Sequence, residues 1–92
     1  MRVHVRVFGF LASIIGRNHH LYLDDDSTIR DLIHRISRRG NQHRSGYIGK
    51  YRVDGGNLAI IVNGKNIALL DGVDTSLSDG DDVVIIPPTA GG

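Results

Sequence analysis

Residues 77–92 have the sequence LSDGDDVVIIPPTAGG, which is the most informative part of the chain for predicting its fold. It opens with a polar turn at residues 78–82, where Asp and Gly favour a tight reversal of the chain. Residues 83–86 (VVII) follow as an apolar run, which is typical of a strand buried on both faces. Two prolines then end the strand, because proline has no N–H to donate to a sheet. We therefore predict one domain over residues 1–88 and a flexible diglycine tail over residues 89–92.

Two strands and a short helix are predicted at the start of the chain. Residues 2–7 (RVHVRV) alternate polar and apolar side chains, which is the period of a strand with its three valines facing the core. Residues 20–23 (HLYL) alternate in the same way. Between them, residues 8–16 are mostly apolar and end in glycine, which indicates a short helix or turn. This tight connection predicts that the two strands pair antiparallel.

The clearest helix follows, because residues 29, 32, 33 and 36 are all apolar and share one helical face. Thr28 and Asp31 have the spacing of a capping box. Aspartates at 24–26 precede the positive end of the helix dipole, and arginines at 35, 38 and 39 lie at its negative end. Gly40 can close the helix in the left-handed conformation. Pattern, caps and charges therefore predict the same element.

The second half of the chain supplies the rest of the sheet. Residues 40–57 contain five glycines and have the least regular pattern, with a short strand predicted at 51–53. Residues 58–62 form an apolar strand. The Asn-Gly pair that follows is a strong hairpin signal, so a further strand is predicted at 65–69.

These elements, with a turn of helix expected at residues 75–77, predict an α+β roll. One main helix packs across a mixed sheet of four to five strands. The first and last strands form a parallel central pair. Because the chain has one long helix, we expect the opposite face of the sheet to be uncovered.

Composition excludes several classes of protein. The chain has 92 residues, with 11 basic and 10 acidic side chains and no cysteine. Near-neutral charge argues against a dedicated nucleic-acid binder. The absence of cysteine excludes a disulfide scaffold, a thiolate zinc site and a cysteine nucleophile. Because there is neither a long apolar run nor a signal peptide, we expect a cytoplasmic protein with no membrane contact.

No group of side chains has the spacing of a catalytic or metal site. His4 and His20 could meet across two strands, but solvated strand positions explain them better. Aspartates at 24–26 and 79–82 lie in turns, where Asp commonly forms local hydrogen bonds. We therefore predict no metal ligands, no bound cofactor and no catalytic residues.

The tail offers one reactive group, the carboxyl group of Gly92. A diglycine end has no side chains, so it can enter a narrow active site in another protein. Attack of this carboxylate on the α-phosphate of ATP would give an acyl-adenylate, which sulfur or an amine could capture. Every catalytic group would then belong to the partner.

Residues 77–92 strongly resemble the C-terminal signature of the MoaD/ThiS family of ubiquitin-like sulfur carriers, which includes archaeal small modifier proteins. The family's typical ending is a leucine, a D-G-D turn, an apolar strand, one or two prolines and Gly-Gly. Residues 7–8, 28–33 and 62–65 are similar to the family's first strand, capped helix and N-G hairpin. The resemblance implies a β-grasp (ubiquitin-like) fold and is weakest over residues 40–57.

The resemblance also implies a carrier function. A ubiquitin-activating-type enzyme would adenylate Gly92 with ATP, and the product would become a thiocarboxylate. Pro88, Ala90 and Gly91 would be recognised as the tail. A synthase or thiolase partner would accept the sulfur for molybdopterin, thiamine or a thiolated tRNA base. The alternative is a ubiquitin-like modifier in which Gly92 is joined to a lysine of a target protein.

A partner surface is expected on the uncovered sheet face beside the tail. Alternation leaves open whether Val83 and Ile85 or Val84 and Ile86 face outward, and loops over central strands are the alternative. We assign the surface to six residues, Ile60, Val62, Val84, Ile86, Asp79 and Asp81. The two aspartates would steer a basic partner, unless they only form a solvated turn.

The basic segment at residues 27–52 supports a second alternative. It carries seven Lys or Arg residues against one Asp, and Tyr47 and Tyr51 could stack on bases. Three of these arginines also lie at the end of the helix, so a solvated face explains them better. Nucleic-acid binding by this β-grasp module is therefore the weaker hypothesis.

Overall fold

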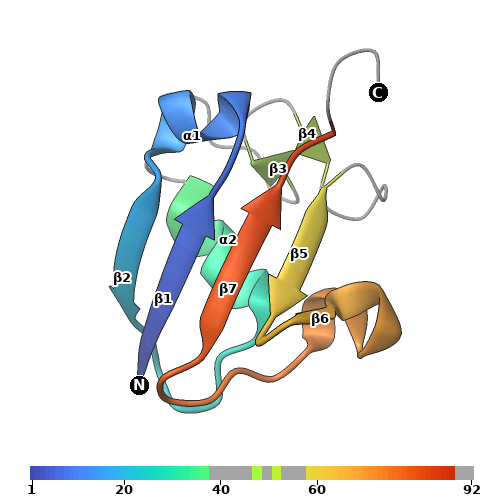
Figure 1. The fold of residues 1–92 in the computed structure, drawn as a ribbon. Coiled ribbons are helices and arrows are strands. Elements are labelled where there is room, and N and C mark those ends of the chain that lie inside the picture. Colours follow the sequence, from blue (N-terminus) through green and yellow to red (C-terminus); the bar gives the residue numbers. More distant parts are fainter. Residues whose placement is uncertain (38–46, 49–50, 53–57, 89–92) are drawn as a thin grey trace.

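A five-stranded mixed sheet forms the centre of the protein (Figure 1). The structure is a computed structural model and describes residues 1–37, 47–48, 51–52 and 58–88. Its elements in chain order are β1 Arg2–Val7, α1 Phe10–Ile15, β2 Asn18–Tyr22, α2 Ile29–Ser37, β3 Tyr47–Ile48, β4 Tyr51–Arg52, β5 Ala59–Val62, β6 Lys65–Asn66, the 3-10 helices η1 Ile67–Leu69 and η2 Gly72–Asp74, and β7 Asp82–Ile86. This order confirms the predicted α+β arrangement with one main helix.

The strands lie in the order β2-β1-β7-β5-β6. The first and last strands are neighbours and run parallel, with Val5 opposite Val83, as predicted. β2 pairs antiparallel with β1, and β5 pairs antiparallel with both β7 and β6. The short strands β3 and β4 form a separate antiparallel pair.

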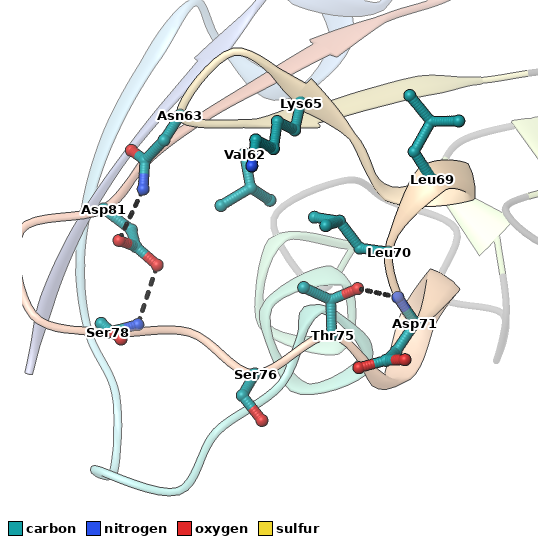
Figure 2. A pocket seen from close by; sticks show the side chains of 10 residues that line it. All are labelled: Val62, Asn63, Lys65, Leu69, Leu70, Asp71, Thr75, Ser76, Ser78 and Asp81. Atoms are coloured by element: carbon teal, nitrogen blue, oxygen red, sulfur yellow. Dashed lines mark hydrogen bonds between the residues drawn. The ribbon is translucent and has the colours of Figure 1, made fainter.

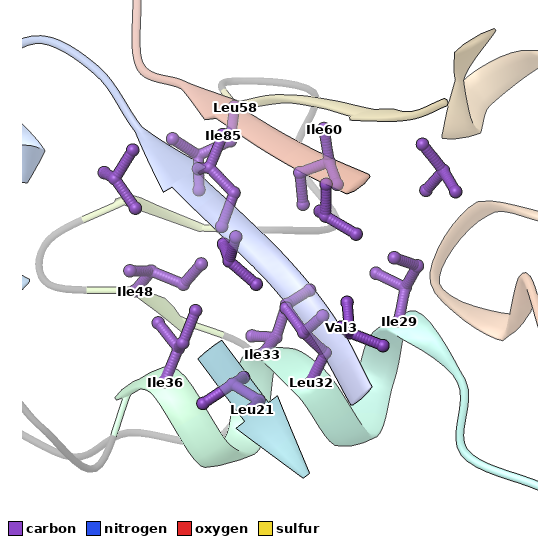
Figure 3. Packing of buried hydrophobic residues seen from close by; sticks show 14 of the residues in the cluster. Val3, Leu21, Ile29, Leu32, Ile33, Ile36, Ile48, Leu58, Ile60 and Ile85 are labelled. Carbon is purple, nitrogen blue, oxygen red and sulfur yellow. The ribbon is translucent and has the colours of Figure 1, made fainter. Parts of the chain in front are cut away.

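The core lies between the sheet and α2 (Figure 3). The helix buries the four apolar residues of its predicted stripe, at 29, 32, 33 and 36. The sheet buries the side chains that alternate onto the same face, among them Val3, Val5, Val7, Ile60, Val83 and Ile85. Apolar side chains that recur with a period of 3.6 along the helix therefore pack against side chains that alternate along the strands, and together they form one apolar layer.

The start of α2 is fixed as the capping box predicts, with one variation. The backbone N–H of Thr28 donates to Asp31 Oδ2 over 2.9 Å. The Thr28 hydroxyl donates to the same oxygen over 3.2 Å. Asp31 thus stabilises the first turn from inside the helix, where a negative charge also interacts favourably with the helix dipole. The predicted end of the helix at Gly40 lies outside the described residues.

Three predicted elements differ in extent. The second strand begins at Asn18 rather than at residue 20. Asn18 and His19 also pair with β1, opposite Arg6 and Val5. The strand predicted at 65–69 stops at Asn66, whose side-chain oxygen accepts from the N–H of Ala68 and turns the chain into η1. The strand predicted at 51–53 is β4, and its partner β3 carried no sequence signal.

The helical turn predicted at residues 75–77 is wrong. The turn lies earlier, in η2, and the Thr75 hydroxyl closes it by donating to the Gly72 carbonyl over 2.7 Å. Residues 75–77 are instead extended. The Thr75 carbonyl accepts from the N–H of Ile29, and the N–H of Leu77 donates to the Ser27 carbonyl. The segment therefore pairs with the chain that leads into α2.

The face of the sheet opposite α2 is the open face, as predicted. Within the described residues, no helix covers it (Figure 1). The described part of the chain also contains no helix that is long and apolar enough to cross a membrane. The tail predicted at residues 89–92 lies beyond the described residues.

Candidate functional site

The chain leaves the sheet at one end, which we call the tail end and define by Phe8, Gly9, Ile86, Pro87 and Pro88. β7 points toward this end, and its parallel neighbour β1 ends there as well (Figure 1). Pro87 is still buried, whereas Pro88 is exposed. The last described residues therefore lie where the chain passes from the core to the surface. Ala90, Gly91 and Gly92 lie outside the described residues.

Gly9 and Pro87 approach each other closely at the tail end. Gly9 has φ +70° and ψ −157°, a combination that only glycine adopts readily. A Cβ atom at this position would lie 3.0 Å from Pro87 Cγ. The loop after β1 therefore packs against Pro87, the last buried residue before the tail.

An apolar surface on the open face adjoins the tail end. We call it the exit patch and define it as Phe8, Ala59, Ile61, Val84 and Ile86. In register, Ala59 lies opposite Ile86, and Ile61 lies opposite Val84. The N–H of Phe8 donates to the Ile85 carbonyl over 3.0 Å, which sets Phe8 beside Ile86. Phe8 and Ile86 are 47% and 37% exposed, so they leave apolar surface uncovered by the described residues.

The register also decides which residues face outward. Val83 and Ile85 are fully buried, so Val84 and Ile86 lie on the open face. The assignment of Ile60 and Val62 to the partner surface is wrong, because both point into the core and are 1% and 7% exposed. The outward positions of β5 are Ala59 and Ile61. The role of Val84 and Ile86 in partner binding remains a prediction.

Asp79 and Asp81 lie at the opposite end of the sheet, before β7 begins. Asp79 Oδ1 accepts the backbone N–H of Arg2 over 2.7 Å. Asp81 accepts from Asn63 Nδ2 over 2.9 Å and from the N–H of Ser78 over 2.8 Å. Along β7, the backbone of Asp81 is separated from that of Ile86 by about 16 Å. The contacts of Asp79 and Asp81 favour the solvated-turn alternative, and steering of a basic partner remains a prediction.

Polar side chains occupy the part of the open face between these two ends. The rings of His4 and His20 stack with centroids 4.5 Å apart. Asp82 lies 2.6 Å from the guanidinium of Arg6 and 3.5 Å from Nδ1 of His4. Among the described residues, no group of three or more His, Asp or Glu side chains could hold a metal ion. The open face therefore changes from polar to apolar along β7.

A groove that the sequence did not predict lies beside the β5–β6 hairpin (Figure 2). It has a volume of roughly 630 Å³, and the side chains of Val62, Lys65, Leu70 and Thr75 line it. Leu69 at its rim is 82% exposed. β6 and the 3-10 helices lie at the end of the sheet away from the tail, so this groove is separate from the exit patch (Figure 1).

Two arginines of the basic segment are held by local contacts. Arg30 pairs with Asp74 over 3.2 Å, and Arg35 donates to the Tyr22 carbonyl over 3.3 Å. The basic residues at 38, 39, 44 and 50, and the side chains of Arg52, Tyr47 and Tyr51, lie outside what the structure describes. Nucleic-acid binding by this segment therefore remains a prediction.

Sequence reasoning missed Phe8 and Gly9 as parts of the site. The available signal was an aromatic residue followed by glycine directly after an alternating strand. Such a glycine often marks a close backbone approach. The strand pattern alone did not show that residue 87 would be the neighbour.

Comparison with known proteins identifies the family of the chain. The family model described as "ThiS family" matches residues 5–92. Small archaeal modifier protein 3 of Haloferax volcanii is 30% identical, and the match covers 100% of both chains.

Two solved structures share the fold. One is a putative molybdopterin converting factor subunit 1 from Pyrococcus furiosus, with 27% identity, a TM-score of 0.74, and coverage of 97% of this chain and 99% of that one. The other is a complex of subunits 1 and 2 of the molybdopterin-converting factor from Helicobacter pylori, with 26% identity, a TM-score of 0.60 and 100% coverage of both chains. The protein therefore has the ubiquitin-like β-grasp fold and belongs to the ThiS family.

Proposed function

We propose that the protein is a sulfur carrier whose reactive group is the carboxyl group of Gly92. A carboxylate oxygen attacks the α-phosphorus of ATP, pyrophosphate leaves, and an acyl-adenylate forms. Hydrosulfide delivered by the partner then attacks the acyl carbon of the adenylate, AMP leaves, and a thiocarboxylate remains on Gly92. The protein is not itself an enzyme, because the activating partner holds ATP and supplies every catalytic group.

The family match carries this proposal, because it extends through Gly92. The position of the tail end adds support. Pro87 is anchored against Gly9, so the residues that follow begin from a fixed point beside the exit patch. Because Pro87 is already fixed, binding of the tail needs no further ordering of the chain before it, although the two glycines themselves lose backbone freedom when a partner holds them. Pro88, Ala90 and Gly91 are then the tail residues that the partner recognises.

The partners follow from the same geometry. We propose that a ubiquitin-activating-type adenylating enzyme and a sulfur-accepting synthase or thiolase each dock on the exit patch while holding the tail. The Helicobacter pylori relative, whose structure is a complex of two converting-factor subunits, supports docking of this kind. Because the reaction consumes ATP, we propose that it takes place in the cytoplasm.

Conjugation is the second candidate function. The 30% identity to a protein named as a small archaeal modifier favours it. The adenylate of Gly92 would then be captured by the amine of a lysine on a target protein, with loss of AMP. Both functions share the activation step and differ in the nucleophile that follows.

Intact mass spectrometry and peptide mapping of the protein from its native host test these functions. Replacement of one terminal oxygen of Gly92 by sulfur supports the carrier, and Gly92–lysine isopeptides on other proteins support the modifier. A variant without Gly91 and Gly92 is the control, and it should fold normally yet support no ATP–pyrophosphate exchange by the host's adenylating enzyme. Exchange that survives this deletion would refute activation at Gly92.

A further inference from the structure

A second groove lies at the tail end, on the side of Phe8 that faces α1 and β2. It has a volume of roughly 470 Å³. Among the described residues its lining is apolar, basic or neutral polar and contains no acidic side chain; it consists of Arg6, Val7, Phe8, Gly9, Ala12, Arg17 and Asn18. We call it the arginine groove. Neither arginine stood out in the sequence, because they are eleven positions apart and belong to no charge cluster.

The two guanidinium groups differ in how they are held. Arg6 is fixed by Asp82, whose Oδ2 lies 2.6 Å from one guanidinium nitrogen, and its side chain remains 43% exposed. Arg17 is exposed, and its guanidinium has no hydrogen bond or ion pair with any described residue. A guanidinium has five N–H donors in a planar fork, so the groove presents donors that are not used within the described fold.

The backbone beneath Arg17 is ordered despite this exposure. α1 ends at the buried Ile15, and Gly16 follows with φ +98° and donates its N–H to the Ala12 carbonyl. The Arg17 carbonyl then accepts the N–H of Val7 over 2.8 Å. The Arg17 side chain therefore projects from a fixed backbone. Binding an anion restricts the rotations of this side chain but does not require the loop to be ordered as well.

The arginine groove adjoins the exit patch at the tail end. Phe8 belongs both to this groove and to the exit patch, and Gly9 contacts Pro87 at the base of the tail. A partner that covers the exit patch and holds the tail would therefore also meet the arginine groove. In contrast, Asp79 and Asp81 lie at the other end of β7 and are occupied by local hydrogen bonds.

We propose that the arginine groove binds an acidic segment of the adenylating enzyme, with carboxylates paired to Arg17 and to the free edge of Arg6. An apolar side chain of the same segment packs on Phe8. Carboxylate matches the guanidinium fork in shape and charge. The position of the groove favours a peptide of the adenylating enzyme over a nucleic acid, because the groove adjoins the exit patch and the base of the tail at Pro87. This inference rests on the proposed activation at Gly92.

Charge reversal at Arg17 tests the proposal in the ATP–pyrophosphate exchange assay with the host's adenylating enzyme. Arg17→Glu should raise the KM for the carrier about tenfold and leave kcat within about twofold, because the groove acts in docking and not in chemistry. Arg17→Lys keeps the charge and should recover most of the loss. Lys65→Glu is the matched control, since it makes the same charge change on an exposed side chain far from the tail end. Its KM should stay within about twofold of wild type.

Salt gives a second readout. The KM of the wild-type carrier should rise as ionic strength increases, and that of Arg17→Glu should rise less, because its favourable charge pair is already lost. Equal KM values for Arg17→Glu and Lys65→Glu, with wild-type exchange intact, would overturn the arginine groove and leave activation at Gly92 standing. No exchange with the wild-type protein would overturn both. Arg17-dependent binding of a labelled oligoribonucleotide, with unchanged exchange kinetics, would assign the groove to nucleic acid instead.

Discussion

Replacing Gly9 by alanine should destabilise the domain by about 3 kcal/mol. The first contribution is conformational, because φ +70° with ψ −157° is strained for any residue that has a Cβ, at a cost of about 1–3 kcal/mol. The second is steric. The new Cβ would lie 3.0 Å from Pro87 Cγ, so Pro87 must move by a few tenths of an ångström, at a cost of about 1 kcal/mol.

Thermal and urea unfolding followed by circular dichroism measure this loss. For a domain of this size, each kcal/mol lowers the Tm by about 4–8 °C, so the Gly9→Ala variant should melt about 12–24 °C below wild type. The urea midpoint should fall with no change in the slope, because the substitution alters the native state and not the surface exposed on unfolding.

Two further variants separate the contributions. Gly64 also has positive φ, at +87°, but a Cβ there would have no atom within 4 Å. Gly64→Ala should therefore cost only the left-handed penalty, about 1–2 kcal/mol. In a double-mutant cycle, Pro87→Ala should recover about 1 kcal/mol of the Gly9→Ala loss, because it removes the ring that the new methyl group meets. Strict additivity of Gly9→Ala and Pro87→Ala would refute the close approach of Gly9 to Pro87. A loss of unfolding free energy below about 0.5 kcal/mol for Gly9→Ala alone would refute it as well.

The remaining predictions concern the core, the polar turn and the exit patch. Val5→Ala should lower the free energy of unfolding in urea by about 2 kcal/mol and Val84→Ala by less than about 1 kcal/mol, since only Val5 is fully buried. Equal losses for the two variants would contradict the observed register. Asp81→Ala should lower the unfolding free energy by about 1–2 kcal/mol, because Asn63 and Ser78 lose their hydrogen-bond acceptor. The KM for the carrier in pyrophosphate exchange should not change, and a raised KM would instead support steering of a basic partner by Asp81. Ile86→Asp should raise that KM about tenfold and lower the unfolding free energy by about 1–2 kcal/mol, because its side chain is only 37% exposed, whereas Leu69→Asp, at the other end of the sheet, should leave the KM unaltered; the reverse ranking would move the docking site.

The elements that could be predicted are those specified by local sequence. Helix α2 has its apolar stripe and its cap within nine residues, and both are present in the structure. β1 alternates along its whole length, so its inward face was known before its partners were. β3 and β4 have two residues each, which is too short for any period to show, and their pairing depends on the fold around them.

The orientation of β5 could not be predicted for a different reason. Its residues are apolar at every position, so the sequence shows a strand without showing which side chains point inward. Only the pairing of Ile60 with Ile85 on β7 fixes the direction, and a shift of one residue would exchange the two faces. This is why Ile60 and Val62 were assigned to the surface although they belong to the core.

The direction of β7 determines which side chains lie at the tail end, where the described part of the chain stops. The sequence places five aspartates between residues 71 and 82, close to the tail in number, and so suggests an acidic site. In the fold, β7 leads from Asp79 and Asp81 to Pro87 at the opposite end of the sheet, so these two carboxylates lie away from the tail end, whereas Asp82 pairs with Arg6. Because β1 runs parallel to β7, it delivers Arg6 and Phe8 to the tail end, and the α1 connection adds Arg17. We therefore expect a partner that docks at the tail end to complement an apolar patch with a basic border, and charge reversal at Arg17 tests that border directly.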